Sequence, residues 1–166
     1  MAALEVKTLK DLLTYSPSTG IFECIKKVSG SKYEIGDTVG TVNSDGYLQV
    51  SIGGKSYKLH RLAFLYIHGV MPEYVDHMNH DRENNMWSNL RATTSAGNSK
   101  NMSMSKGNTS GTTGVSQRSN GKWRAYITVD YKKLYLGAFI NKENAVKARQ
   151  DAEVLHNYHE NHGKVA

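Results

Sequence analysis

The stretch Tyr74–Asn101, YVDHMNHDRENNMWSNLRATTSAGNSKN, decides how the rest of this chain is interpreted. It is rich in Asp, His and Asn, whose side chains ligate hard metal ions, move protons or orient a neighbouring group. Asp76 and His77 follow an apolar residue, so we predict that they end a short strand. The residues Leu90–Thr93 are predicted to form a second short strand.

A short helix is predicted after the second strand, N-capped by Thr94 or Ser95 and carrying Asn98. This order of strand, loop, strand and helix brings Asp76 and Asn98 face to face, with His77 beside them. Carboxylate and amide oxygens are hard ligands for a Mg²⁺-like ion that keeps several waters. Histidine can deprotonate a water near neutral pH. The stretch therefore predicts hydrolysis of a phosphodiester, with His77 as general base.

Asn89 lies 12 residues after His77 and 9 residues before Asn98. We expect its side chain to bind the other ring nitrogen of His77 and to fix the tautomer. The alternative interpretation is a polar surface loop, in which Asn, Asp and His stabilise turns without catalysis. Composition alone favours that alternative.

The stretch resembles the HNH nuclease motif of phage and intron-encoded endonucleases, in the version whose last H is Asn. The resemblance rests on Asp76 and His77, on the loop segment NMWSNL at residues 85–90 and on Asn98, and upstream it extends to near residue 9. It implies that Asp76 and Asn98 ligate the metal ion. It also implies that His77 is the general base and that Asn89 orients it. The implied cofactor is Mg²⁺, for which Mn²⁺ or another divalent ion can substitute.

The net charge of +6 is unevenly distributed along the 166 residues. Residues 1–99 hold ten Lys or Arg and ten Asp or Glu, whereas residues 100–166 hold eleven and five. The excess therefore lies wholly in the C-terminal part, where Tyr and Trp are interleaved with the basic residues. Such a segment indicates a nucleic-acid surface, although a lone charge run is more often a solubilising face.

The single cysteine, Cys24, excludes an internal disulfide and a cysteine-based zinc cluster. No apolar run is long enough to span a bilayer, and the start of the chain lacks a signal-peptide pattern. We therefore expect a cytoplasmic protein, in the host cytoplasm if a phage encodes it.

The N-terminal half is predicted to form small elements that pack against the nuclease motif. We expect a helix over residues 6–15, a strand over residues 21–24 and a hairpin over residues 47–59 with a two-glycine turn. Residues 60–68 are predicted to form a helix with a glycine stop. Within that helix Arg61 could contact a phosphate or simply cover the core with its stem.

Residues 102–111, MSMSKGNTSG, are rich in Ser and Gly and weakly patterned. We predict an HNH endonuclease domain at 1–103, a flexible linker at 104–112 and a DNA-binding domain at 113–166.

The segment after the linker is predicted to form three antiparallel strands packed on one helix. The strands are expected at residues 114–118, 122–129 and 134–139, and the helix is expected after Asn141. Its apolar stripe is predicted to consist of Ala145, Ala148, Ala152 and Leu155. The fold class is therefore α+β, with a small ββα-metal domain followed by this three-stranded sheet on a helix.

One face of the predicted sheet is basic and aromatic, which suits contacts to phosphates and base edges. The alternative is an ordinary solvent-facing side of an antiparallel sheet. Residues 114–115, 121–127 and 136–139 resemble the AP2/ERF DNA-binding domain, which implies that the sheet faces the major groove. The predicted DNA-binding residues of the whole chain are Arg61, Arg118, Lys122, Arg124, Tyr126, Thr128, Lys133 and Tyr135.

The sequence as a whole predicts a metal-dependent DNA endonuclease of the homing type. Two alternatives stay open: a DNA-binding regulator whose nuclease site has decayed, and an RNA-directed nuclease, because basic aromatic sheet faces also stack bases. The expected partner is double-stranded DNA, with no membrane and no small-molecule cofactor. We expect a monomer rather than a dimer.

Overall fold

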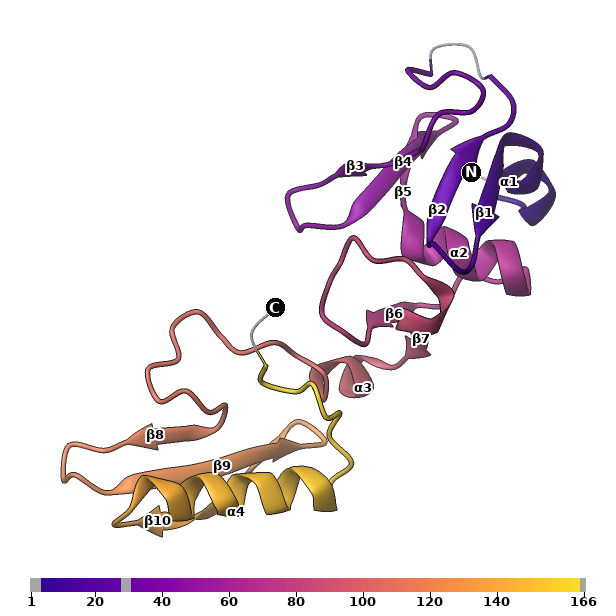
Figure 1. Ribbon diagram of the computed structural model, residues 1–166. Helices are drawn as coiled ribbons and strands as arrows, with labels where there is room; N and C mark the ends of the chain where they lie inside the picture. The colour runs from indigo at the N-terminus through magenta and orange to yellow at the C-terminus, as the bar shows by residue number, and fades with distance from the viewer. Residues whose placement is uncertain (1–3, 28–30, 165–166) are drawn as a thin grey trace. The chain divides into compact units, whose positions relative to one another are not determined.

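The structure is a computed structural model that describes residues 4–27 and 31–164. The chain divides into two compact units, Met1–Thr93 and Thr94–Ala166, which we refer to as the first unit and the second unit. Figure 1 labels the helices and strands of both. Each unit combines small antiparallel sheets or a single sheet with short helices, which agrees with the α+β class predicted from the sequence.

The first unit begins with helix α1 (Val6–Leu12), which leads directly into strand β1 (Leu13–Ser16). This strand pairs antiparallel with β2 (Ile21–Cys24). The helix is shorter than the sequence predicted. Leu13 and Tyr15 are buried and alternate with half-buried neighbours, which is the two-residue period of a strand with one face on the core.

A three-stranded antiparallel sheet follows, in the order β3 (Thr41–Val42), β4 (Leu48–Ile52) and β5 (Lys55–Lys58). The strands β4 and β5 form the predicted hairpin. Its turn residues, Gly53 and Gly54, have φ values of 58° and 76°, which residues with a Cβ adopt at a cost.

Helix α2 (Leu59–His68) follows the hairpin without an intervening loop and ends at Gly69 in the left-handed conformation. The predicted helix and its glycine stop are thus confirmed. Leu62 and Ala63 on this helix are fully buried. The helix therefore carries the apolar face on which the rest of the unit packs.

The core of the first unit joins α1, the β1–β2 hairpin and α2. The rings of Tyr15 and Phe22 stack at 4.6 Å, and Tyr66 meets Tyr15 edge-on at 5.9 Å. Leu9 and Val39 complete the most deeply buried part of this cluster. This core supports the segment that was central to the sequence analysis.

That segment forms the predicted strand, loop and strand. Strand β6 (Tyr74–His77) pairs antiparallel with β7 (Leu90–Thr93), so Asp76 lies opposite Arg91. A single turn of 3-10 helix, η1 (Trp87–Asn89), leads the loop into β7. Asp76 and His77 stand at the end of β6, as the sequence predicted.

The second unit opens with the predicted short helix α3 (Ser95–Ser99), whose N-cap Thr94 accepts a hydrogen bond from a backbone N–H at 3.1 Å. The C-terminal segment holds the end of this helix. The N–H of His159 donates to the carbonyl of Lys100 at 3.1 Å, and the Lys100 ammonium donates to the carbonyl of His156 at 2.8 Å. The helix is thus tied to the last residues of its own unit.

The sheet of the second unit has the order β10 (Lys132–Phe139), β9 (Trp123–Val129) and β8 (Val115–Gln117), and all pairs are antiparallel. Helix α4 (Lys142–Leu155) lies along one face of this sheet (Figure 1). Three strands on one helix is the arrangement that the sequence predicted. Within the described ranges of the chain, no helix combines the length and apolar character that crossing a bilayer requires.

The buried side of α4 differs from the predicted apolar stripe. Ala145 and Ala152 are buried as expected, but Leu155 is 74% exposed because it is the last residue of the helix. Arg149 is only 2% exposed and takes a position on the buried side. Its burial is possible because its guanidinium is hydrogen-bonded inside the unit, as described below.

The segment predicted as a flexible linker, residues 104–112, folds into hydrogen-bonded turns. The N–H of Met104 donates to the carbonyl of Lys164 at 3.0 Å. Ser110 is 7% exposed, and its hydroxyl donates to the carbonyl of Thr112 at 2.9 Å. The boundary between the two compact units accordingly falls before α3 rather than within this segment.

Candidate active site

His77 stands at the end of β6 with its ring buried, and Asn85 determines how the ring is held. The two side chains lie 3.1 Å apart, from Nε2 of His77 to Oδ1 of Asn85. The amide nitrogen of Asn85 donates to the carbonyl of Glu83 at 3.2 Å, which fixes the amide oxygen toward the ring. Because an amide oxygen only accepts, Nε2 must carry the hydrogen. In the neutral ring Nδ1 is then the basic nitrogen.

Asn85 is itself held by the β1–β2 hairpin. It is 1% exposed, and its carbonyl accepts a hydrogen bond from the Tyr15 hydroxyl at 2.7 Å. Burial raises the pKa of Tyr15 to about 12, so the hydroxyl stays protonated and donates at all ordinary pH values. A Cβ at Gly20 would lie 2.3 Å from the backbone nitrogen of Met86. Glycine is therefore required where the hairpin packs against the loop backbone.

Asn89 braces the loop with both polar atoms of its side chain. Its side-chain oxygen accepts from the N–H of Asn79 at 3.0 Å, and its amide nitrogen donates to the carbonyl of Asn84 at 2.8 Å. The sequence predicts that Asn89 orients the His77 ring, whereas Nε2 of His77 contacts Asn85 in the structure. The sequence offered no signal to distinguish them, because the loop contains several asparagines and only its folded path decides which one meets the ring.

Asp76 forms an ion pair with its cross-strand neighbour. Oδ2 of Asp76 accepts from Nε and Nη2 of Arg91 at 3.0 Å and 2.7 Å. The carboxylate is largely buried, whereas the Arg91 side chain is one-third exposed. Arg91, which the sequence analysis did not single out, therefore fixes the carboxylate and offsets its charge.

A second histidine packs against the first. The rings of His60 and His77 meet edge-on at 4.9 Å, and Tyr47 lies 4.9 Å from His60 and 5.8 Å from His77. Burial, with smaller contributions from neighbouring His77, Lys58 and Arg61, lowers the pKa of His60 to about 3. His60 is therefore a neutral ring at physiological pH.

Burial also lowers the pKa of His77 from its ordinary value. The hydrogen bond that His77 donates to Asn85 and the charge of Asp76 oppose this effect, and the Arg82 guanidinium adds to it. A neutral His77 ring with hydrogen on Nε2 is the form that can accept a proton at Nδ1.

The predicted metal ligands are distributed over both units, with Asp76 in the first and the exposed Asn98 in the second. Residues 4–27 and 31–164 contain no group of three or more His, Cys, Asp or Glu side chains that could hold an ion. One carboxylate and one amide oxygen are nevertheless a suitable donor set for a hard ion that retains waters and takes further oxygens from a phosphate. The pairing of Asp76 with Asn98 stays a prediction.

The predicted DNA-binding residues of β9 share one face of the sheet. Arg124, Tyr126 and Thr128 alternate along the strand, and their β10 partners include Lys133 opposite Thr128 and Tyr135 opposite Tyr126. The Lys133 ammonium lies 4.2 Å from the centroid of the Tyr126 ring, and the Arg124 guanidinium lies 5.6 Å from it. The sheet therefore brings these five residues together.

The three other predicted DNA-binding residues differ in their surroundings. Arg118 and Lys122 are exposed next to each other at the β8–β9 turn, where the N–H of Arg118 donates to the carbonyl of Lys122 at 2.8 Å. Arg61 is half-buried in the first unit and donates from Nη2 to the carbonyl of Pro72 at 3.1 Å. Its Nε is buried without a hydrogen-bond partner among the described residues. These contacts favour the covering role for Arg61 over the phosphate contact.

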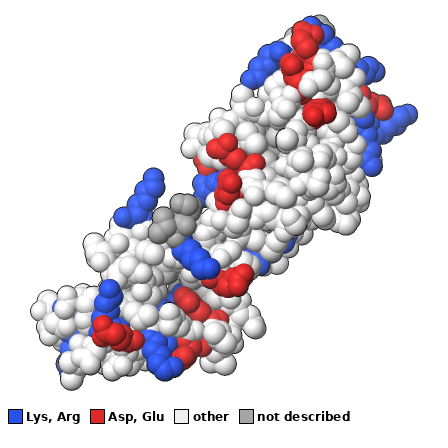
Figure 2. All heavy atoms as spheres, in the orientation of Figure 1, with Lys and Arg blue, Asp and Glu red and all other residues white. Residues whose placement is uncertain are grey.

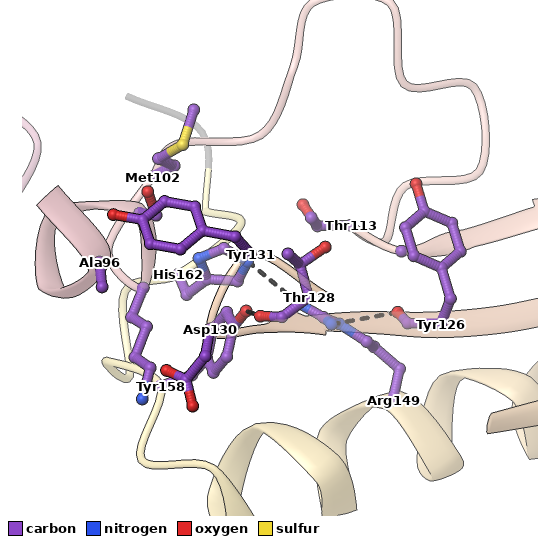
Figure 3. A pocket seen from close by; sticks show the side chains of 13 residues that line it. Ala96, Met102, Thr113, Tyr126, Thr128, Asp130, Tyr131, Arg149, Tyr158 and His162 are labelled. Atoms are coloured by element: carbon purple, nitrogen blue, oxygen red, sulfur yellow. Dashed lines mark hydrogen bonds between the residues drawn. The ribbon is translucent and has the colours of Figure 1, made fainter. Parts of the chain in front are cut away.

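A pocket of about 340 Å³ lies within the second unit, and Tyr126 and Thr128 line it (Figure 3). Arg149 reaches into it from α4 and donates to the carbonyl of Tyr126 at 3.1 Å. Its other guanidinium nitrogens contact Oε1 of Glu153 at 2.9 Å and Nε2 of His162 at 3.1 Å. Arg149 thus joins the helix, the central strand and the C-terminal segment, which explains its burial.

Charged side chains of both signs are interspersed on the face that Figure 2 shows. The positive excess of residues 100–166 is therefore not gathered into one continuous patch on that face. The feature of the second unit that favours a nucleic-acid surface is its strand register, which places cations and tyrosines together.

Residues 57–100 match the model of a family described as HNH endonuclease. No curated protein matches the chain. Among solved structures the chain is similar to one described as "DNA binding and cleavage by the HNH homing endonuclease I-HmuI", at 28% identity and a TM-score of 0.40. The similarity covers 57% of this chain and 53% of that chain, so this chain spans about half the length of the protein it matches.

Proposed function

We propose that residues 57–100, which match the model of the HNH endonuclease family, hold the active site of a metal-dependent endonuclease that hydrolyses phosphodiester bonds in double-stranded DNA. The observation that carries the proposal is the His77–Asn85 contact at the end of β6, inside the matched segment. It supplies a buried imidazole with a fixed tautomer, which is what a general base requires. The homing type is proposed with it, from the resemblance that the motif carries.

In this proposal Nδ1 of His77 takes the proton of the attacking water. Asn85 keeps the hydrogen on Nε2, so that the lone pair stays on the opposite nitrogen. The Tyr15 hydroxyl and the tight approach at Gly20 keep Asn85 in place. Asn89 acts one step further away, by bracing the loop that carries Asn85. Such preorganisation lets the base act without rearrangement during the reaction.

Asp76 and Asn98 would hold the ion, for which Mg²⁺ is proposed and Mn²⁺ or another divalent ion could serve. A bound ion supplies charge neutralisation at the phosphate and stabilises the departing oxygen. Arg91 holds the Asp76 carboxylate and offsets its charge, which weakens attraction for a cation in the absence of substrate. The expected site is therefore one that fills well only when phosphate oxygens are present.

The second unit is proposed to bind DNA through the sheet face described above, in the manner of an AP2/ERF domain. This is supported by the register of β9 and β10, which groups Arg124 and Lys133 around Tyr126. Arg118 and Lys122 extend the same cationic surface at the adjoining turn. Arginine and lysine at such a face can contact phosphates and base edges together.

The proposal is tested by incubating the purified full chain with supercoiled plasmid DNA. Cleavage is expected with Mg²⁺ or Mn²⁺ and is expected to stop in excess EDTA. An Asp76→Asn variant should be inactive under the same conditions, because the ion loses its only proposed carboxylate ligand. Single-stranded RNA added as competitor should inhibit poorly. Cleavage that persists in EDTA would contradict the metal-dependent mechanism, and preferential cleavage of RNA would contradict the substrate.

A further inference from the structure

A cluster of two cations on one tyrosine lies beside the candidate base. The Lys58 ammonium is 4.1 Å from the centroid of the Tyr47 ring, and the Arg82 guanidinium is 5.0 Å from it. Both cations are also anchored at Asp45. Nη1 of Arg82 donates to the Asp45 carbonyl at 2.6 Å, and the Lys58 ammonium lies 3.6 Å from its carboxylate. We call Tyr47, Lys58 and Arg82 the Tyr47 cluster.

The ring of Tyr47 joins the Tyr47 cluster to the candidate active site. Tyr47 lies 5.8 Å from the His77 ring, centroid to centroid. Arg82 belongs to the loop between β6 and β7 that also carries Asn85, and its bond to Asp45 joins that loop to the turn before β4. Two cations thus contact a ring whose centroid lies 5.8 Å from that of the proposed base.

The cluster keeps a net positive charge. Two cations face the single carboxylate of Asp45, which is 61% exposed and lies 3.6 Å from the Lys58 ammonium, so one carboxylate offsets at most one of them. An aromatic ring attracts a cation without cancelling its charge. Arg82 uses one of its five N–H donors toward Asp45, and Lys58 has three donors, so both can bind an additional anion.

Cation–ring pairs are common on protein surfaces, and two single pairs in the same unit show the ordinary case. Lys10 lies 4.9 Å from the Tyr66 ring, and Lys32 lies 5.0 Å from the Tyr33 ring. The Tyr47 cluster differs because two cations share one ring and the ring also contacts a histidine pair. In the second unit, two cations share Tyr126 on the proposed DNA-binding face.

We propose that Lys58 and Arg82 bind a phosphate of the DNA strand next to the phosphodiester bond that is cut, with Tyr47 as the platform that positions them. Arginine offers a fork that matches phosphate oxygens, and lysine adds a mobile point charge. The proposed contact would align the strand with His77. It assigns substrate positioning to the first unit, and it rests on the proposed function, in which DNA is the substrate.

The test measures DNA affinity in EDTA, so that binding is read without cleavage. Full-length wild type is compared with Arg82→Gln and Lys58→Gln on a labelled duplex by fluorescence anisotropy. Each variant should bind about three- to tenfold more weakly, and should lower the slope of log affinity against log salt by about 1. The matched control is Lys10→Gln, which removes a cation from the Tyr66 ring and should bind as wild type.

A second measurement locates the phosphate. Single phosphates near the mapped cleavage position are replaced by neutral methylphosphonates. Replacement of one phosphate close to the cut should weaken DNA binding by wild type. The same replacement should weaken binding by Arg82→Gln very little further, because the variant already lacks the contact. Unchanged thermal unfolding of Arg82→Gln excludes a folding defect, which is expected to be absent because the side chain is exposed.

The outcomes separate this inference from the proposed function. If wild type cleaves DNA but both variants bind with wild-type affinity and salt slope, the phosphate site is refuted and the nuclease function stands. A sensitive phosphate far from the cut also refutes it. If wild type fails to cleave while the variants weaken binding as expected, the nuclease function fails, and Lys58 and Arg82 are left as a DNA phosphate contact without a role in cleavage.

Discussion

Acidification should destabilise the first unit because His60 is buried as a neutral ring. Its residue surface is 4% exposed, and its Nδ1 is buried without a hydrogen-bond partner among the described residues. The pKa of His60 is about 3 in the folded chain, whereas the ordinary value is 6.5. Between these two pH values the unfolded chain binds more protons than the folded chain. The free energy of unfolding must therefore fall as the pH falls below 6.5.

The size of this effect follows from the width of the pH window. One proton contributes ~1.36 kcal/mol per pH unit, so lowering the pH from 6.5 to 5.0 should cost about 2 kcal/mol through His60 alone. The lowered pKa of His77 acts in the same direction. Both contributions are fully present near pH 7 and are progressively lost on acidification.

Urea unfolding followed by the fluorescence of Trp87 measures this effect. Trp87 packs 4.6 Å from Phe64 in the first unit, and a Trp123→Phe background removes the tryptophan of the second unit. The matched control is His60→Phe, which keeps a ring but cannot be protonated. Its free energy of unfolding should depend less steeply on pH than that of the parent, by the contribution of about one proton. It should also stay folded at pH 5. An identical pH slope in His60→Phe and the parent would refute the assignment of a buried neutral His60.

Three further substitutions test how the site and the second unit are held. Asn85→Leu should slow single-turnover cleavage about 10–100-fold while leaving DNA affinity intact, because it releases the ring of His77. Gly20→Ala should lower the urea-unfolding free energy by about 3 kcal/mol, whereas Gly54→Ala, at the same φ of 76° with nothing within 4 Å of its Cβ, should cost clearly less. Arg149→Met should destabilise the second unit by about 3 kcal/mol in thermal unfolding, because buried partners of the guanidinium lose their hydrogen bonds. Wild-type stability of Gly20→Ala or Arg149→Met, or wild-type cleavage by Asn85→Leu, would contradict the corresponding contact.

The local elements of the nuclease segment could be predicted from the sequence. Short-range signals specify them: Asp76 and His77 end an apolar strand, Thr94 is a good N-cap, and the glycine pair at 53–54 makes a hairpin turn. The predicted helix over residues 6–15 was too long. Residues 13–15 form strand β1 instead, because they pair with β2, and this pairing is a tertiary effect.

The contacts within the site could not be predicted in the same way. Asn84, Asn85 and Asn89 are chemically equivalent in the sequence, and the loop path alone brings Asn85 to the His77 ring. The burial of Arg149 was also missed, because an arginine at a helical position ordinarily indicates a solvent-exposed face. Its three partners come from distant parts of the chain, so no local pattern contains them.

The measurement that tests the central claim most directly is the rate of DNA cleavage by His77→Ala, read beside its DNA affinity in EDTA. His68→Ala, at an exposed histidine on α2, is the matched control. Loss of a positioned general base should lower the single-turnover rate by ~10²–10⁴-fold and leave affinity unchanged. A wild-type rate in His77→Ala would contradict the account and would place the base elsewhere.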